Sequence, residues 1–271
     1  GATSGTDLKN ESAAVLYDKN IINRFGGTGA DGALAISSGT TTIDLGSATL
    51  VVKNYTSISI TGTGKLAFTN PHANGTIIDL KSQGDVILTS STVPLIEVSE
   101  LGATGASAGA SEGGNGSAGN MIYYHINGTV SIGGSGSTGS IVGSTGGATA
   151  VSALANSRLY VFDVNSAITL HASTEVLMAC GAGGGSSGGA TGIAGAAGGR
   201  GGGALLIECL GALNITGTIY AKGGVGGTGS GGTASTGGGG GGSGGTIAIF
   251  YRTLTANSGT YTVSGGNGGK G

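Results

Sequence analysis

The sequence lacks tryptophan, contains only two prolines and two cysteines, and has few charged residues, at 9% of the chain. Two cysteines are too few for a disulfide scaffold. A formal net charge of −2 without basic clusters gives no electrostatic footprint for nucleic acid. No apolar run approaches the roughly 20 residues that span a bilayer. We therefore expect neither a nucleic-acid partner nor a membrane span.

Glycine, by contrast, is abundant and supplies 63 of the 271 residues. Chains rich in glycine are often disordered, because they bury too little apolar surface to offset the conformational entropy lost on folding. Here the hydrophobic fraction is 38%, and short runs of Val, Ile, Leu and Tyr separate the glycine-rich blocks. Collagen is excluded, since glycine does not recur at every third position. The pattern predicts an ordered chain.

Two glycine-rich blocks of equal length, 181–203 and 223–245, repeat at an offset of 42 residues. The apolar segments that follow the two blocks match at the same offset, with Ile207 corresponding to Ile249. Self-similarity at a fixed period is typical of stacked supersecondary units. The repeat therefore organises the second half of the chain.

Short runs rich in β-branched residues, bounded by Gly, Ser or Asn, begin at Gly32 and are typical of strands. No stretch shows a helical apolar period. From Gly75 the runs form five triplets, which begin near residues 76, 121, 158, 204 and 246. We predict an all-β fold: a single-stranded parallel β-helix with about three strands per coil and glycine-rich, polyglycine-II-like insertions at one corner. Residues 1–31 are interpreted as an N-terminal adapter or capping segment, and 32–271 as the glycine-rich β-helix.

Alignment of the first strands of the predicted coils places four polar residues in one column: Asp79, His125, Asp163 and Glu208. Neighbouring parallel strands lie about 4.8 Å apart, and carboxylates that close together can act as general acid and base on a polysaccharide. The alternative is a solvated polar column on the outer face of the sheet. Because no second column of Lys, Arg or aromatic residues accompanies it, we favour the exposed column and assign no catalytic residue.

The same strands carry a column of apolar residues at outward positions: Ile77, Tyr123, Val161 and Leu206. Such a column predicts a face covered by the chain's own insertions or by another subunit. Cys180 and Cys209 either pair in an oxidising compartment or serve as two small buried hydrophobic residues. The three histidines have no carboxylate or Cys at metal-ligand spacing, and no glycine pattern opens a helix, so no metal or cofactor is expected.

The blocks GGVGGTGSGG and GGGGGGSGG, followed by TIAIFY and the closing GGNGGKG, resemble glycine-rich β-solenoid regions of extracellular surface proteins and of bacteriophage tail-fibre adhesins. In those adhesins, polyglycine-II helices pack into a sandwich that carries receptor-binding loops. The resemblance covers roughly residues 102–271 and implies a protein that is secreted or displayed on a cell or virion surface. The sequence begins without Met or an apolar leader, which fits a mature secreted product.

Two functions follow from these patterns. The first is a non-enzymatic extracellular structural protein, a β-helix protomer that self-assembles into a filament or surface layer, because an open coil presents unpaired backbone groups to another copy. The alternative is a phage tail-fibre or cell-surface adhesin that binds a glycan or an outer-membrane receptor through its loop corner.

Overall fold

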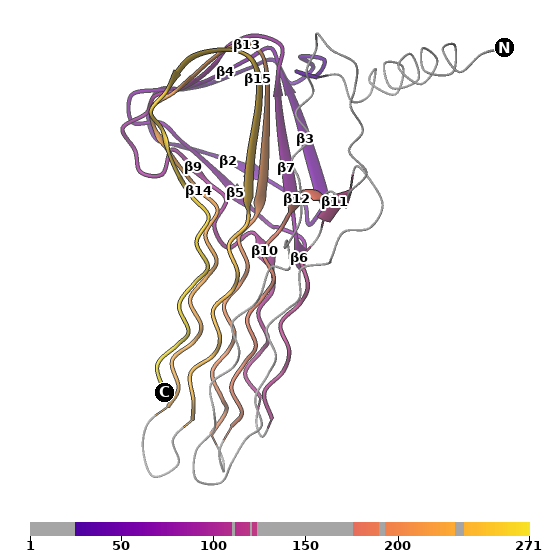
Figure 1. The fold of residues 1–271 in the computed structure, drawn as a ribbon, viewed down its shortest axis with the longest axis vertical. Helices are drawn as coiled ribbons and strands as arrows, with labels where there is room; N and C mark the ends of the chain where they lie inside the picture. The colour runs from indigo at the N-terminus through magenta and orange to yellow at the C-terminus, as the bar shows by residue number, and fades with distance from the viewer. Residues whose placement is uncertain (1–24, 110–111, 120, 124–175, 190–192, 231–235) are drawn as a thin grey trace, which may run out of the picture.

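The computed structural model describes residues 25–109, 112–119, 121–123, 176–189, 193–230 and 236–271. Within these ranges the chain forms sixteen strands and no helix. Its two large sheets are built entirely from parallel pairs, and two small sheets are antiparallel (Figure 1). The predicted all-β class with parallel sheets is confirmed for this part of the chain.

The larger sheet has seven strands and turns a corner within one long strand. Its strands are β1 (Ala33–Ile36), β4 (Ser57–Ile60), β8 (Val86–Leu88), β13 (Ala204–Ile215), β7 (Ile77–Ser82) and β3 (Leu50–Tyr55), with β15 (Thr246–Asn257) beside β13. The first half of β13 pairs with β7 and the second half pairs with β8. Gly211 lies at the corner, where an added Cβ would press against the backbone of Gly84. Glycine therefore allows the two layers to stay in contact around the bend.

The second large sheet has five strands: β2 (Thr40–Asp44), β5 (Lys65–Thr69), β9 (Ile96–Glu97), β14 (Thr218–Tyr220) and β16 (Thr260–Thr262). The antiparallel pairs join β6 (Asn74–Gly75) to β10 (Gly102–Ala103) and β11 (Met121–Tyr123) to β12 (Val176–Ala179). In Figure 1 the two large sheets lie together at one end of the molecule.

The main hydrophobic core draws its residues from both large sheets. Successive side chains of a strand point to opposite faces, so alternate residues enter the core. In β4, Ile58 and Ile60 are buried while the two serines are only partly covered. Leu66 of β5 and Ile219 of β14 join them from the other sheet. This alternation fixes which face of each strand is inward.

The stacking order differs from the predicted succession of five coils. Ile77 of β7 pairs directly with Ala204 of β13, and Ile96 of β9 pairs with Ile219 of β14. The segments that begin near residues 121 and 158 therefore do not stack between those that begin near 76 and 204, and this part of the prediction was wrong. After β12 the chain lies again beside the place where it left the stack, since Ala103 N–H donates to Gly181 O at 2.9 Å.

At the 42-residue offset the structure follows the repeat. Ile207 of β13 lies opposite Ile249 of β15, and Thr218 of β14 lies opposite Thr260 of β16. The two matched segments form adjacent layers of the two sheets. A step of 42 residues in the sequence therefore corresponds to a step from one strand to its neighbour in each sheet.

The glycine-rich segments extend away from the sheets and run side by side (Figure 1). Their backbones bond to one another: Gly184 N–H donates to Gly199 O at 2.8 Å, and Gly199 N–H donates to Gly240 O at 2.8 Å. Gly198 N–H reaches a third segment at Ala106 O, 2.9 Å away. A Cβ at Gly184 would overlap the carbonyl oxygen of Gly240, so the close approach requires glycine there. These segments are thus a hydrogen-bonded layer.

Candidate functional site

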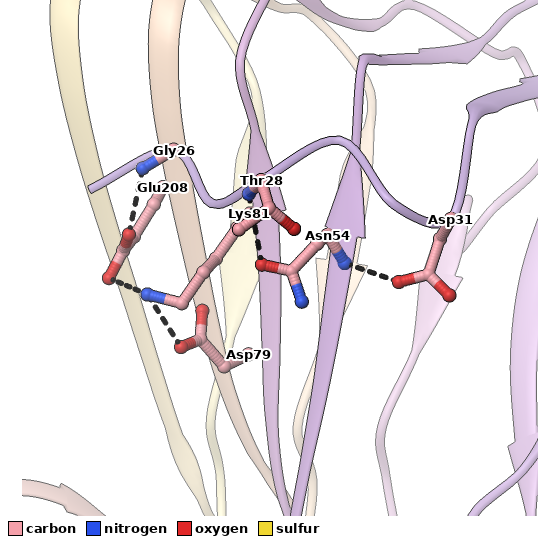
Figure 2. Close-up of polar contacts among 7 residues, drawn as sticks. All are labelled: Gly26, Thr28, Asp31, Asn54, Asp79, Lys81 and Glu208. Carbon is pink, nitrogen blue, oxygen red and sulfur yellow. Dashed lines mark hydrogen bonds and ion pairs between the residues drawn. The ribbon is translucent and has the colours of Figure 1, made fainter. Parts of the chain in front are cut away.

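A buried cluster of three charged side chains lies on the face of the larger sheet that points away from the core (Figure 2). Lys81 Nζ lies 2.8 Å from Glu208 Oε1 and 3.2 Å from Asp79 Oδ2. The Lys81 side chain is only 3% exposed, and those of Asp79 and Glu208 are 10% and 12% exposed. The cluster therefore joins two neighbouring strands where water has little access.

Successive side chains of a strand point to opposite faces of the sheet, and this alternation brings the three charged side chains together. Asp79 and Lys81 are two residues apart in β7 and share one face, while Leu80 between them enters the core. Glu208 of β13 is directly opposite Lys81 in the parallel pair. The cross-strand position places the ammonium group against the Glu208 carboxylate.

The segment that precedes β1 covers the cluster. Gly26 N–H donates to Glu208 Oε2 at 3.0 Å. Gly27 has a φ of +72°, and an added Cβ there would press against Lys81 and Asn54. Only glycine combines this left-handed backbone with so close an approach. The two glycines therefore seal the cluster from solvent.

The same segment is held on β3 by a short chain of hydrogen bonds (Figure 2). Thr28 N–H donates to Asn54 Oδ1 at 3.3 Å, and Asn54 N–H donates to Asp31 Oδ2 at 2.6 Å. Asp31 N–H in turn donates to the Asn54 carbonyl oxygen at 2.8 Å. These bonds fix the position of Gly26 above Glu208.

The cluster holds two carboxyl groups and one ammonium group. Burial, reinforced by the nearby Glu208 carboxylate, raises the pKa of Asp79 to about 7 despite the attraction of Lys81. Asp79 Oδ1 is buried and has no hydrogen-bond partner, which costs less for a neutral carboxyl than for a carboxylate. Burial alone would lower the pKa of Lys81, but the two carboxylates outweigh it and raise that pKa. The ammonium is the resting form of Lys81.

The predicted polar column is only partly reproduced. Asp79 and Glu208 share a face, but Asp79 lies opposite Leu206 and Glu208 lies opposite Lys81, so the predicted register was wrong by two residues. The prediction of an exposed column was also wrong for Asp79, which the preceding segment and the neighbouring strand bury. His125 and Asp163 lie outside the described residues. Sequence reasoning missed Lys81, although a Lys two residues after Asp79 in a strand signals a shared face.

Ile77 and Leu206, from the predicted apolar column, are 2% and 7% exposed. They pack in a second apolar cluster with Ala204, Cys180 and Ala248. The backbone of Tyr123 lies in β11, which pairs with β12, and its side chain is outside the description. Val161 also lies outside the described residues.

Cys180 and Cys209 are both buried thiols and form no disulfide. Cys209 belongs to the main core, whereas Cys180 belongs to the second apolar cluster on the other face of β13. The sheet therefore separates the two sulfur atoms, and the disulfide alternative was wrong. Burial raises the pKa of both thiols, that of Cys180 to about 12, which keeps them protonated and poorly nucleophilic.

Within the described ranges, no group of three or more His, Cys, Asp or Glu side chains is placed to hold a metal ion. The same ranges contain no helix able to cross a membrane. The burial of Asp79 and Glu208 leaves an external sugar little access to the paired carboxyl groups. The side chains of Asp79, Lys81 and Glu208 can therefore form ion pairs or react with one another.

A second notable surface lies along β15, the last long strand. Among the described strands, β15 pairs with β13 alone. Tyr251 and Leu254 of this strand are 46% and 43% exposed, and the following residues include Tyr261 at 37% and Val263 at 47%. A long strand with unpaired backbone groups and exposed apolar side chains is a template for another chain.

No protein-family model, curated protein or solved structure matches this chain.

Proposed function

We propose that the two large sheets are faces of a parallel β-helix with about three strands per coil. Three parallel columns support this interpretation: β3, β7, β13 and β15 form the first, and β1, β4, β8 and the second half of β13 form the second. The third contains β2, β5, β9, β14 and β16. On this interpretation the glycine-rich layer consists of polyglycine-II-like insertions at one corner, because its backbones bond to several neighbours at once.

We infer that the chain is a non-enzymatic extracellular structural protein that self-assembles into a filament or surface layer. The observation that carries this proposal is the free edge of the twelve-residue strand β15. Four of the eight large exposed apolar side chains lie between residues 251 and 263, two on β15 and two on or just after β16, the end strand of the other large sheet. Burial of this edge by pairing would satisfy backbone groups and cover apolar surface together.

The occupant of the edge in this proposal is a second copy of the chain. At the opposite end of the same column, β3 pairs with β7 alone among the described strands. Asp31 bonds to the backbone of Asn54 near the end of β3, and Leu50 at its start is 43% exposed. Both end strands run in the same direction as the strands between them. Pairing of β15 with β3 of another copy would continue the parallel sheet, and such a head-to-tail contact builds open filaments.

Sedimentation velocity over a range of protein concentrations tests this proposal. We expect the average sedimentation coefficient to rise with concentration, with species larger than dimers, because each added copy presents a new free edge. A single species with the mass of one chain at every concentration would refute self-assembly.

A second proposal is an adhesin of a tail fibre or cell surface that binds a glycan or an outer-membrane receptor. Its support is the hydrogen-bonded glycine layer, which extends beyond the two large sheets (Figure 1). A glycan array and a binding assay with outer-membrane vesicles test it. Saturable binding of either probe by the single chain would favour the adhesin, and an absence of binding to both would count against it.

A further inference from the structure

The buried cluster of Asp79, Lys81 and Glu208 is arranged for a covalent reaction between its own members. We propose that the Lys81 amine and the Glu208 carboxyl group condense to an isopeptide bond that staples β7 to β13. The two residues are directly opposite each other on neighbouring strands, with 2.8 Å between Nζ and Oε1. Regular pairing on both sides holds the two backbones in place, so the reacting groups stay together for the lifetime of the fold.

The reaction balances without any further reagent. A proton passes from Lys81 Nζ to Glu208 Oε1 along their hydrogen bond and leaves an amine facing a carboxylic acid. Nζ attacks Cδ of Glu208, a carbon–nitrogen bond forms, and the bond from Cδ to Oε1 breaks. That oxygen leaves as water with two of the three ammonium hydrogens. The product is a neutral amide, which removes two buried charges.

Two neighbours are placed to assist this condensation. The Gly26 N–H, 3.0 Å from Oε2, holds the oxygen that remains and stabilises the negative charge that develops on it during attack. Asp79 Oδ2 lies 3.2 Å from Nζ on the other side. Its carboxyl group can accept a proton from the amine and return one to the leaving oxygen. With a pKa of about 7, this group exchanges protons readily near neutral pH.

Three features distinguish this cluster from an ordinary ion pair. The amine is almost fully buried, two carboxyl groups share it, and one carboxyl oxygen of Asp79 is buried without a partner. The positive charge on Lys81 at rest does not prevent the reaction. The bond forms only once per chain, so a small population of molecules with a neutral Lys81 amine is enough. The burial that excludes solvent also keeps water from reversing the step. The bond would close a long loop and so restrict the unfolded chain, as a disulfide does.

The intact mass of the purified chain, measured after denaturation, tests this inference. We expect a mass below that of the sequence by one water molecule. Proteolysis should yield a branched peptide that joins β7 to β13 through Lys81 and Glu208. Lys81→Arg keeps the positive charge but presents a guanidinium that does not condense, so this variant should have the full sequence mass. Asp79→Asn should accumulate the linked form more slowly after refolding.

The measurement on the unmodified sequence decides the question even where a variant fails to fold. A wild-type chain of full sequence mass, with Lys81 and Glu208 recovered in separate peptides, would overturn the inference. Loss of water with a link from Lys81 to Asp79 would overturn the assignment of Glu208 as the partner. Neither result bears on self-assembly through β15, which sedimentation tests separately.

Discussion

Ile77 lies directly opposite Ala204 in the parallel pair of β7 and β13, although more than a hundred residues of chain separate them. The same pairing continues to Ser82 and Cys209. Two segments distant in sequence therefore form adjacent layers of one sheet. The stack therefore depends on long-range packing rather than on local succession.

The packing of Leu205 of β13 in the main hydrophobic core should be essential for stability. Leu205 is fully buried in the main core, so Leu205→Ala removes packed methyl groups and should lower the free energy of unfolding by about 2–5 kcal/mol. Leu50→Ala, at a position 43% exposed, is the matched control and should change it by less than about 1 kcal/mol. Urea denaturation followed by circular dichroism measures both. Equal losses in the two variants would contradict the placement of Leu205.

The raised pKa of Asp79 should make stability depend on pH. Between its ordinary value of 3.8 and about 7, native Asp79 holds a proton that the unfolded chain has released. The free energy of unfolding therefore falls as pH rises through that interval and levels off above it. Asp79→Asn cannot titrate, so its stability relative to wild type should increase with pH across the interval.

Urea denaturation at about pH 5 and about pH 8 measures this difference. Asp44→Asn makes the same substitution at an exposed position on β2, outside the cluster, and is the matched control. If Asp79→Asn and wild type lose stability in parallel as pH rises, Asp79 does not hold its proton in the folded chain.

The glycine layer should be sensitive to a single methyl group. A Cβ at Gly184 would overlap the carbonyl oxygen of Gly240, so Gly184→Ala must push two segments apart and should cost roughly 1–3 kcal/mol. Gly268→Ala is the matched control, because the nearest atom to its Cβ would be 3.6 Å away. Thermal unfolding measures both variants. A Gly184→Ala variant as stable as Gly268→Ala would show that the layer is not packed as described.

The exposed part of β15 should control self-association. Leu254→Lys places a charge on the edge without disturbing the core, since the residue is 43% exposed, and it should weaken association roughly tenfold or more. Val93→Lys introduces a lysine at a position that is 65% exposed and lies outside β15, between β8 and β9. Sedimentation velocity compares the two variants. Equal association of both would place the contact elsewhere.

The sequence was informative where the repeat is regular. The offset of 42 residues correctly predicts that Ile207 lies opposite Ile249, because equal segments present equal apolar patterns to each other. It does not reveal that β7 pairs with β13, since these two strands lie more than a hundred residues apart in the sequence. Local patterns of strand residues carry no information about which distant edge a segment will find.

At the candidate site, too, the sequence pattern predicts the face of a strand on which a residue lies but not its partner on the next strand. A shift of two residues leaves every side chain on the same face of a strand, so the alternation placed Asp79 and Glu208 together without fixing which residue each one opposes. Their burial depends on Gly26 and Gly27, which belong to no repeat. The ion cluster with Lys81 therefore became visible only in three dimensions.

Electron cryomicroscopy of the concentrated wild-type chain tests self-assembly most directly. If copies join through β15, the images should show unbranched filaments with strands perpendicular to the axis, spaced about 4.8 Å apart along it. The Leu254→Lys variant should show short particles under the same conditions. Single-chain particles alone, with no filament at any concentration for the wild type, would contradict the proposed structural function.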